Sequence, residues 1–159
     1  GRVRATKVYC RARAVHGANP CYSCVYRGAQ SSMTFYGFMA VGIGAALGAW
    51  LRWGFGIVLN PLLSSMLLGT LTANLVGGYL IGMAVEYFVH HDSVPPELRL
   101  FVIVGFLGGL TTFSSFSSEA VELLSDRELG WTLILIATHV LGSLAMTWLG
   151  ILTVRAMHV

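Results

Sequence analysis

Four long apolar segments limit what this chain can fold into. They cover residues 34–59, 67–89, 98–124 and 131–154 of the 159 residues. Each is long enough to cross the hydrocarbon core of a bilayer, which takes about 20 residues in a helix. Only 11% of the chain is charged, whereas a soluble domain carries about 25% charged residues. The sequence therefore predicts an all-α integral membrane protein with four transmembrane helices in a lipid bilayer, and a single domain over residues 33–159.

Residues 1–32 differ from the rest of the chain. They contain six basic residues and no acid, while residues 33–159 carry four arginines and seven acids. The basic character therefore comes from this segment, and we expect no nucleic-acid partner. The segment lacks the apolar core of a signal peptide, and its one CxxC pair, Cys21 and Cys24, lacks the second pair that a zinc site needs. We expect a leader that is disordered or not native, with Met33 as the true start.

The arginines after Met33 are divided evenly between the two ends of the spans. Four spans place both termini on one side, with Arg99 and Arg155 there and Arg52 and Arg127 on the other side. Orientation in the membrane follows the asymmetry of lysine and arginine, and two against two gives no preference. A chain of this kind could insert in either direction, which would permit an antiparallel, dual-topology homodimer. The six charges of the leader would remove that balance.

Small residues recur at four-residue intervals in the first two spans. Ala40, Gly44 and Gly48 do so in the first span, and Gly78 and Gly82 form a GxxxG pair in the second. Small side chains at this spacing let membrane helices approach closely. We expect them to hold the helices together without a further role.

No catalytic set stands out in the spans, so an enzyme is not expected. His139 has no carboxylate at helical spacing, and there is no HExxH, no GxSxG and no pair of aspartates. The polar residues are neutral: Asn74 lies near the middle of the second span, and His139, Ser143 and Thr147 share one helix face in the fourth. Such residues either join helices or line a polar path, and the residues alone leave both open.

The stretch "GFLGGLTTFSSFSSE", residues 105–119, interrupts the apolar character of the third span. Gly108 and Gly109 are expected to break the helix near its centre, which a membrane tolerates only where the backbone is buried in protein or lines a cavity. Carbonyls freed at a break can hold a cation. Phe113 and Phe116 follow on one face, and the positive edges of two rings beside hydroxyl donors would suit a small anion. Their spacing alone favours plain core packing.

The segments "GTLTANLVGGYLIG" and "GFLGGLTTFSSFSSE", with "GAWLRW" in the first span and "GSLAMT" in the fourth, closely resemble the Fluc fluoride channels, also called the CrcB family. The resemblance covers essentially all of residues 33–159. It implies an antiparallel homodimer with two pores, each lined by both subunits. It also implies passive, fluoride-selective export from the cytoplasm across a bacterial inner membrane, with no enzyme activity and no organic cofactor.

The resemblance also assigns roles to individual residues. Asn74 would donate a hydrogen bond to fluoride, and the edges of the Phe113 and Phe116 rings would coordinate it. The remaining pore residues would supply hydroxyls: Ser114, Ser115, Ser143 and Thr147. The family usually has threonine where this chain has Ser115.

Further roles lie beside the pore. The backbone carbonyls of Gly108 and Thr111, with those of a second copy, would hold a structural sodium ion at the dimer centre. Arg52 would lie in the aqueous vestibule and attract anions. Glu119 matches the acid of the family after its second phenylalanine, and we expect it to be an interfacial or structural partner.

Two other functional classes fit less well. A small multidrug-resistance exporter shares four short spans and dual topology but needs a buried carboxylate in its first span, and residues 33–85 contain no acid before Glu86. A helical scaffold without transport would leave Asn74, Phe113 and Phe116 without a purpose.

Overall fold

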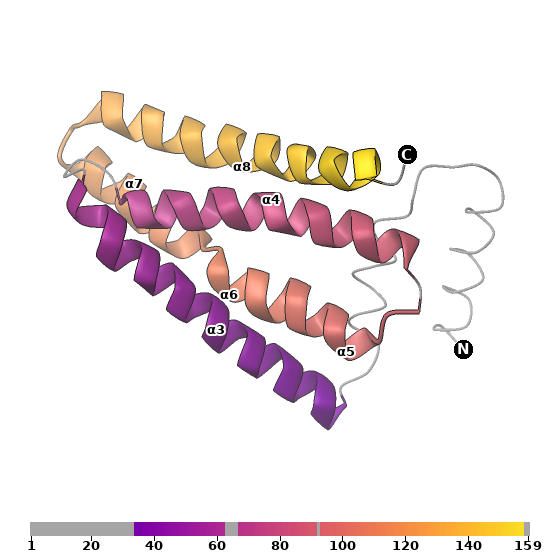
Figure 1. The fold of residues 1–159 in the computed structure, drawn as a ribbon. Helices are drawn as coiled ribbons and strands as arrows, with labels where there is room; N and C mark the ends of the chain where they lie inside the picture. The colour runs from indigo at the N-terminus through magenta and orange to yellow at the C-terminus, as the bar shows by residue number, and fades with distance from the viewer. Residues whose placement is uncertain (1–33, 63–66, 92, 158–159) are drawn as a thin grey trace, which may run out of the picture.

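The computed structural model of the chain describes residues 34–62, 67–91 and 93–157, and this part is almost entirely helical (Figure 1). The first, second and fourth segments are α3 (Phe35–Leu59) with a final turn η1 (Asn60–Leu62), α4 (Leu68–His90) and α8 (Leu129–Met157). The third consists of α5 (Pro96–Arg99), η2 (Leu100–Leu107), α6 (Gly108–Leu110) and α7 (Phe113–Ser125). The predicted leader and its cysteine pair lie outside the described residues.

The four predicted spans are confirmed as helical segments long and apolar enough to cross a membrane. They cover Phe35–Leu62, Leu68–His90, Pro96–Ser125 and Leu129–Met157. The fourth helix runs three residues beyond its predicted end, through Arg155. The apolar character of the segment ends at that arginine, but the helix continues past it. A cation in the last turn is favourable at the negative end of the helix dipole.

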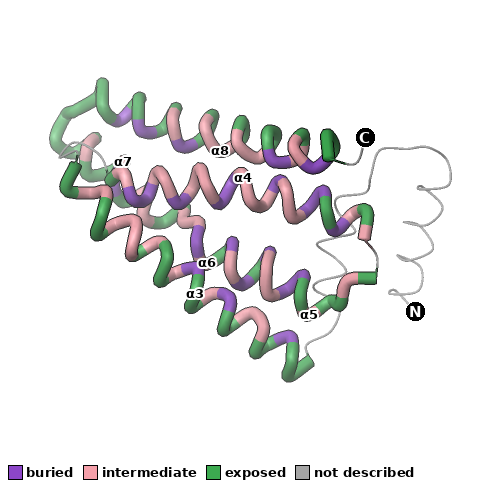
Figure 2. Tube along the Cα trace, in the orientation of Figure 1, coloured by how far each residue is buried: buried purple, intermediate pink, exposed green. Residues whose placement is uncertain are grey.

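α4 is the central helix of the bundle. It lies along α8 over its length and also contacts α3 and η2 (Figure 1). In its most apolar stretch 39% of the residues are buried, against 11% in α3, and buried positions recur along the whole of α4 (Figure 2). α3 packs mainly against η2, and to a lesser extent against α4 and α6. The outward faces of α3 and α8 carry exposed large apolar side chains, as expected where lipid or a second copy is the neighbour.

Glycines set the distances between these helices. A β-carbon at Gly44 or Gly48 of α3 would overlap the carbonyl oxygens of Phe101 or Phe106 in η2. On the α4–α8 contact, a β-carbon at Gly82 would overlap the Thr147 carbonyl oxygen, and one at Gly150 the Tyr79 carbonyl oxygen. The prediction that small residues allow close helix approach is therefore confirmed.

Gly150→Ala is expected to destabilise the protein by about 2–3 kcal/mol, because the added methyl meets backbone that cannot move aside without separating α8 from α4. Gly130→Ala, in the first turn of the same helix, is the control, since a β-carbon there meets nothing within 4 Å. The measurement is the thermal unfolding midpoint in detergent. Equal midpoints for the two variants would contradict the close contact.

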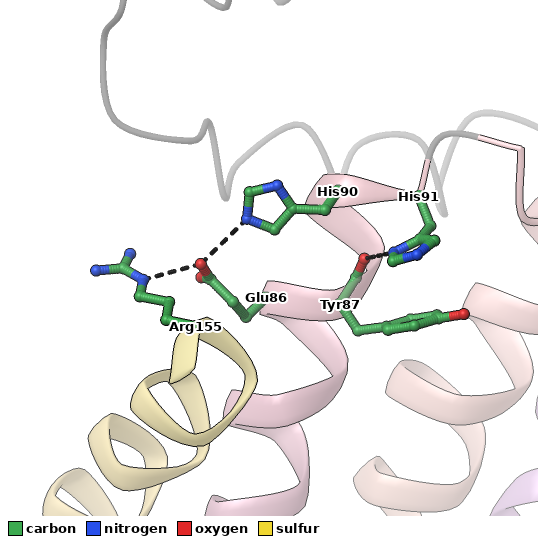
Figure 3. Close-up of polar contacts among 5 residues, drawn as sticks. All are labelled: Glu86, Tyr87, His90, His91 and Arg155. Carbon is green, nitrogen blue, oxygen red and sulfur yellow. Dashed lines mark hydrogen bonds and ion pairs between the residues drawn. The ribbon is translucent and has the colours of Figure 1, made fainter. Parts of the chain in front are cut away.

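Charged residues join α4 and α8 at the end where α3 begins and α8 finishes (Figure 3). The Glu86 carboxylate lies 2.9 Å from Nε of Arg155 and 3.3 Å from Nε2 of His90. Only 1% of the Glu86 side chain is exposed, against 41% of Arg155. Nearby, Nδ1 of His91 donates to the Tyr87 carbonyl at 2.9 Å, and the two rings stack. The ion pair between Glu86 and Arg155 attaches the last turn of α8 to the end of α4.

Candidate functional site

The helical conformation stops between α6 and α7, where Thr111 and Thr112 are extended. Their φ and ψ angles are −81° and 152°, and −150° and 125°. The prediction that Gly108 and Gly109 are the breaking residues is wrong, because both are helical in α6. Gly109 serves close packing instead: a β-carbon there would overlap the Ala45 backbone of α3. Threonine suits the extended position, since it is β-branched and a good helix N-cap.

Thr112 begins α7 as its N-cap. Its Oγ1 accepts a hydrogen bond from the Ser115 amide at 3.3 Å. The hydroxyls of Ser114 and Ser115 also lie within hydrogen-bonding distance of Thr112 Oγ1, at 3.1 and 3.2 Å. The two serines predicted to supply pore hydroxyls therefore gather around this cap. The role of Thr112 was not predicted from the sequence, although threonine is among the residues favoured at a helix N-cap.

Asn74 of α4 binds the extended segment from the side. Its Oδ1 accepts from the Thr112 amide at 2.7 Å, and its Nδ2 donates to the Thr112 carbonyl at 2.9 Å. The same nitrogen lies 3.1 Å from Nδ1 of His139 on α8. Asn74 thus connects three helical segments, as an amide within a membrane span must be hydrogen-bonded to be tolerated.

Two carbonyls at and just after the end of α6 lack the amide donors that a continuous helix would provide. In a continuous helix the Gly108 carbonyl would accept from the Thr112 amide, and the Thr111 carbonyl from the Ser115 amide. Those amides donate instead to Asn74 Oδ1 and Thr112 Oγ1. The oxygens predicted to bind sodium are therefore deprived of the usual donors, which suits them to a cation.

The Gly109 carbonyl, between these two, is bound by a side chain. Nε of Arg52, from α3, donates to it at 3.2 Å. A cation at the C-terminal end of a helix is favourable because the last carbonyls there are negative. Arg52, predicted to lie in an aqueous vestibule, is half-buried against α6.

Arg52→Gln is expected to lower the stability by about 1.5–3 kcal/mol, the range for a hydrogen bond that involves a charged group. Arg127→Gln is the matched control, because it removes the same charge from an exposed turn between α7 and α8. Thermal unfolding in detergent compares them. Equal losses would mean that net charge, rather than the bond to Gly109, carries the effect.

The two predicted ring residues have different environments. Phe113 is 77% exposed, whereas Phe116 is 8% exposed and packs against Leu135. The ring centroids are 5.4 Å apart with the planes at 61°, an edge-to-face arrangement. Phe116 also stacks on the His139 ring at 4.7 Å. The Phe116 ring is therefore part of the core, whereas the Phe113 ring is exposed beside it.

A cavity of about 340 Å³ lies between α4, the extended segment, α7 and α8. It brings together five of the predicted site residues and adds His139. Its lining consists of Asn74, Gly78, Ile81, Thr111, Thr112, Phe113, Phe116, His139, Val140 and Ser143. Several predicted residues are absent from this lining: Arg52, Gly108, Ser114, Ser115 and Thr147. The Thr147 hydroxyl donates to the Ser143 carbonyl at 2.9 Å, one turn further along α8.

Glu119 lies apart from the cavity, beside the start of α4. Its Oε1 accepts a hydrogen bond from the Leu67 amide, and Asn60 Oδ1 accepts one from the Gly69 amide at 2.8 Å. An acidic side chain at a helix N-terminus satisfies amides that have no helical partner. The contact joins α7 to α4 and fits a structural role.

A family described as "CrcB-like protein, Camphor Resistance (CrcB)" matches residues 39–151. The match extends from α3 into α8 and includes every residue of the cavity lining. The chain belongs to the CrcB-like family. The resemblance stated from the sequence is therefore confirmed.

Three curated proteins similar to this member of the CrcB-like family share the name "Fluoride-specific ion channel FluC". The protein from Nitrosospira multiformis is 61% identical over 123 residues, which cover 77% of this chain and 96% of that protein. The one from Pseudomonas aeruginosa is 57% identical over 119 residues, 75% of this chain and 94% of its own. The one from Cupriavidus pinatubonensis is 56% identical over the same shares.

Proposed function

We propose that this chain is a fluoride-selective passive channel that releases fluoride from the cytoplasm down its electrochemical gradient. The observation that carries the proposal is the 61% identity to a protein named as a fluoride-specific ion channel, over 96% of that protein's length. The cavity agrees with it chemically, because it offers neutral donors and ring edges. A pore must bind its ion strongly enough to admit it and weakly enough to release it.

The physiological purpose follows from acid chemistry. Hydrofluoric acid is weak, so its neutral form crosses membranes and ionises in a near-neutral cytoplasm, where fluoride accumulates. In a bacterial inner membrane, the potential favours exit of the anion by about 2.3 kcal/mol per 100 mV. Transport of this kind needs neither catalysis nor an energy-coupling group, so we place the protein among channels and not among enzymes.

The proposed assembly is an antiparallel homodimer. Phe113 supports it, since a phenyl ring that is 77% exposed beside a partly polar cavity is suited to face a second copy. The rings of both copies would then border two pores. The serines of α7 and Thr147 of α8 would extend the polar path beyond the cavity.

We further propose that the Gly108 and Thr111 carbonyls hold a structural sodium ion with those of the partner subunit. The support is the diversion of the Thr112 and Ser115 amides to side chains. The ion would supply positive charge between the two third spans and take no part in chemistry.

Replacement of sodium by N-methylglucamine at equal ionic strength is therefore expected to weaken the dimer, because carbonyl dipoles of the two copies would face one another without a cation between them. Size-exclusion chromatography in detergent at falling protein concentration measures dissociation. The same dissociation in both solutions would contradict a sodium site.

The decisive test of function is fluoride efflux from liposomes that contain the purified chain. Liposomes are loaded with potassium fluoride, valinomycin is added, and an electrode follows external fluoride, with potassium chloride liposomes in parallel. Fluoride release without chloride release is the expected result. A folded dimer that releases neither ion would overturn the proposal, and proton-coupled export of cationic drugs would then be tested.

A further inference from the structure

The orientation of the Asn74 amide is determined by one backbone residue. Because Thr112 is extended, its N–H and C=O point to the same side, and each meets the matching end of the amide, at 2.7 and 2.9 Å. A reversed amide would place donor against donor and acceptor against acceptor. The atom of Asn74 that faces His139 is therefore Nδ2, which can only donate.

This orientation determines where His139 carries its proton. Asn74 Nδ2 lies 3.1 Å from His139 Nδ1, so Nδ1 must accept, and a neutral imidazole then carries its hydrogen on Nε2. Phe116, stacked on the imidazole at 4.7 Å with 27° between the planes, holds the ring in place. His139 thus has one defined tautomer and one defined orientation.

In the same geometry both amide hydrogens of Asn74 are engaged in hydrogen bonds. Its Nδ2 has two hydrogens, and one is directed at the Thr112 carbonyl and the other at His139 Nδ1. In this arrangement Asn74 has no hydrogen left for an anion. Asn74 is therefore better placed to organise the site than to contact the ion.

His139 does have a donor to offer. It is 4% exposed, and its Nε2 is buried without a hydrogen-bond partner among residues 34–62, 67–91 and 93–157. A buried N–H without an acceptor is unfavourable, so a bound ligand that accepts it stabilises the site. His139 lines the same cavity as the Phe113 and Phe116 rings, which can offer positive edges.

We propose that Asn74 is a positioning residue that acts through His139: it holds Thr112 extended, fixes the His139 tautomer, and thereby presents Nε2–H as the donor that a small, partly dehydrated anion meets in the cavity. The identity of the anion as fluoride rests on the proposed function. A cation is disfavoured at this point, because the protonated nitrogen has no lone pair to give it.

Nuclear magnetic resonance of the full chain in liposomes, with ¹⁵N-labelled histidine, tests the tautomer directly. The chain has five histidines, and a His139→Gln sample identifies the signals of His139. We expect an unprotonated Nδ1 and a protonated Nε2, and a shift of the Nε2 signal on addition of potassium fluoride but not of potassium chloride. Asn74→Asp is expected to place a proton on Nδ1, because a carboxylate only accepts.

Transport supplies a second, independent pair of variants should Asn74→Asp fail to fold. His139→Leu is expected to slow fluoride efflux at least about tenfold, the loss of one hydrogen bond to an ion. His139→Gln is expected to keep much more of the efflux, because its amide offers an acceptor to Asn74 and a donor to the anion.

The results separate this inference from the proposed function. Wild-type protein that releases no fluoride overturns the proposed function. A wild-type protein that releases fluoride but has its His139 proton on Nδ1, or an Nε2 signal that fluoride leaves unchanged, overturns the inference. Equal efflux from His139→Leu and His139→Gln overturns it as well.

Discussion

Phe113→Ala is expected to abolish fluoride efflux and leave the fold intact, whereas Phe116→Ala is expected to impair both. Phe113 is 77% exposed and contributes little to packing within one chain, while Phe116 is 8% exposed, packs with Leu135 and stacks on His139. Removal of a buried phenyl ring costs about 3–5 kcal/mol through lost contacts and the cavity left behind. Efflux from liposomes and thermal unfolding in detergent separate the two effects.

Two further variants sharpen this comparison. Phe113→Ile keeps an apolar side chain but lacks the positive ring edge, so it should lose efflux as Phe113→Ala does. Phe38→Ala, at a ring on α3 that is 72% exposed and lies outside the cavity lining, should keep efflux. Normal efflux from Phe113→Ile would show that the ring edge does not contact the ion. Equal stability of the two alanine variants on α7 would contradict the core position of Phe116.

The difference between the two rings could not be predicted from their spacing. Residues three apart lie on the same helix face, and the sequence "FSSF" predicts nothing more about the two rings. Which of the two points inward depends on where α7 lies against α8, and in particular on Leu135. The four spans themselves could be predicted, because long uncharged apolar segments have few alternatives to crossing a membrane as helices.

The residues that interrupt the third span also could not be predicted from local sequence. Glycine lowers helix propensity, which made Gly108 and Gly109 the expected site. Tertiary contacts decide otherwise: α3 needs a residue without a side chain at Gly109, and Asn74 supplies hydrogen bonds to an extended Thr112. Asn74 and Thr112 are 38 residues apart in the chain, so no local pattern could indicate that they are partners.

The ion pair at the end of α4 gives the second large effect, and it is expected to be asymmetric. Arg155→Met removes the arginine from the Glu86 carboxylate, of which 1% is exposed, while His90 stays 3.3 Å away, and should destabilise the protein by about 1.5–3 kcal/mol. Glu86→Gln leaves the Arg155 side chain, of which 41% is exposed, able to turn toward water, and should cost less than about 1 kcal/mol. The thermal unfolding midpoint of each variant in detergent measures the difference.

The double variant Glu86→Gln with Arg155→Met identifies the cause. If the loss in Arg155→Met comes from a buried carboxylate deprived of its arginine, removal of that charge should restore most of the stability. If it comes instead from lost packing of the long arginine side chain, the double variant should remain as unstable as Arg155→Met. Recovery would establish that the end of α8 is held to α4 by charge, in contrast to the contacts at Gly82 and Gly150, where it is held by close backbone approach.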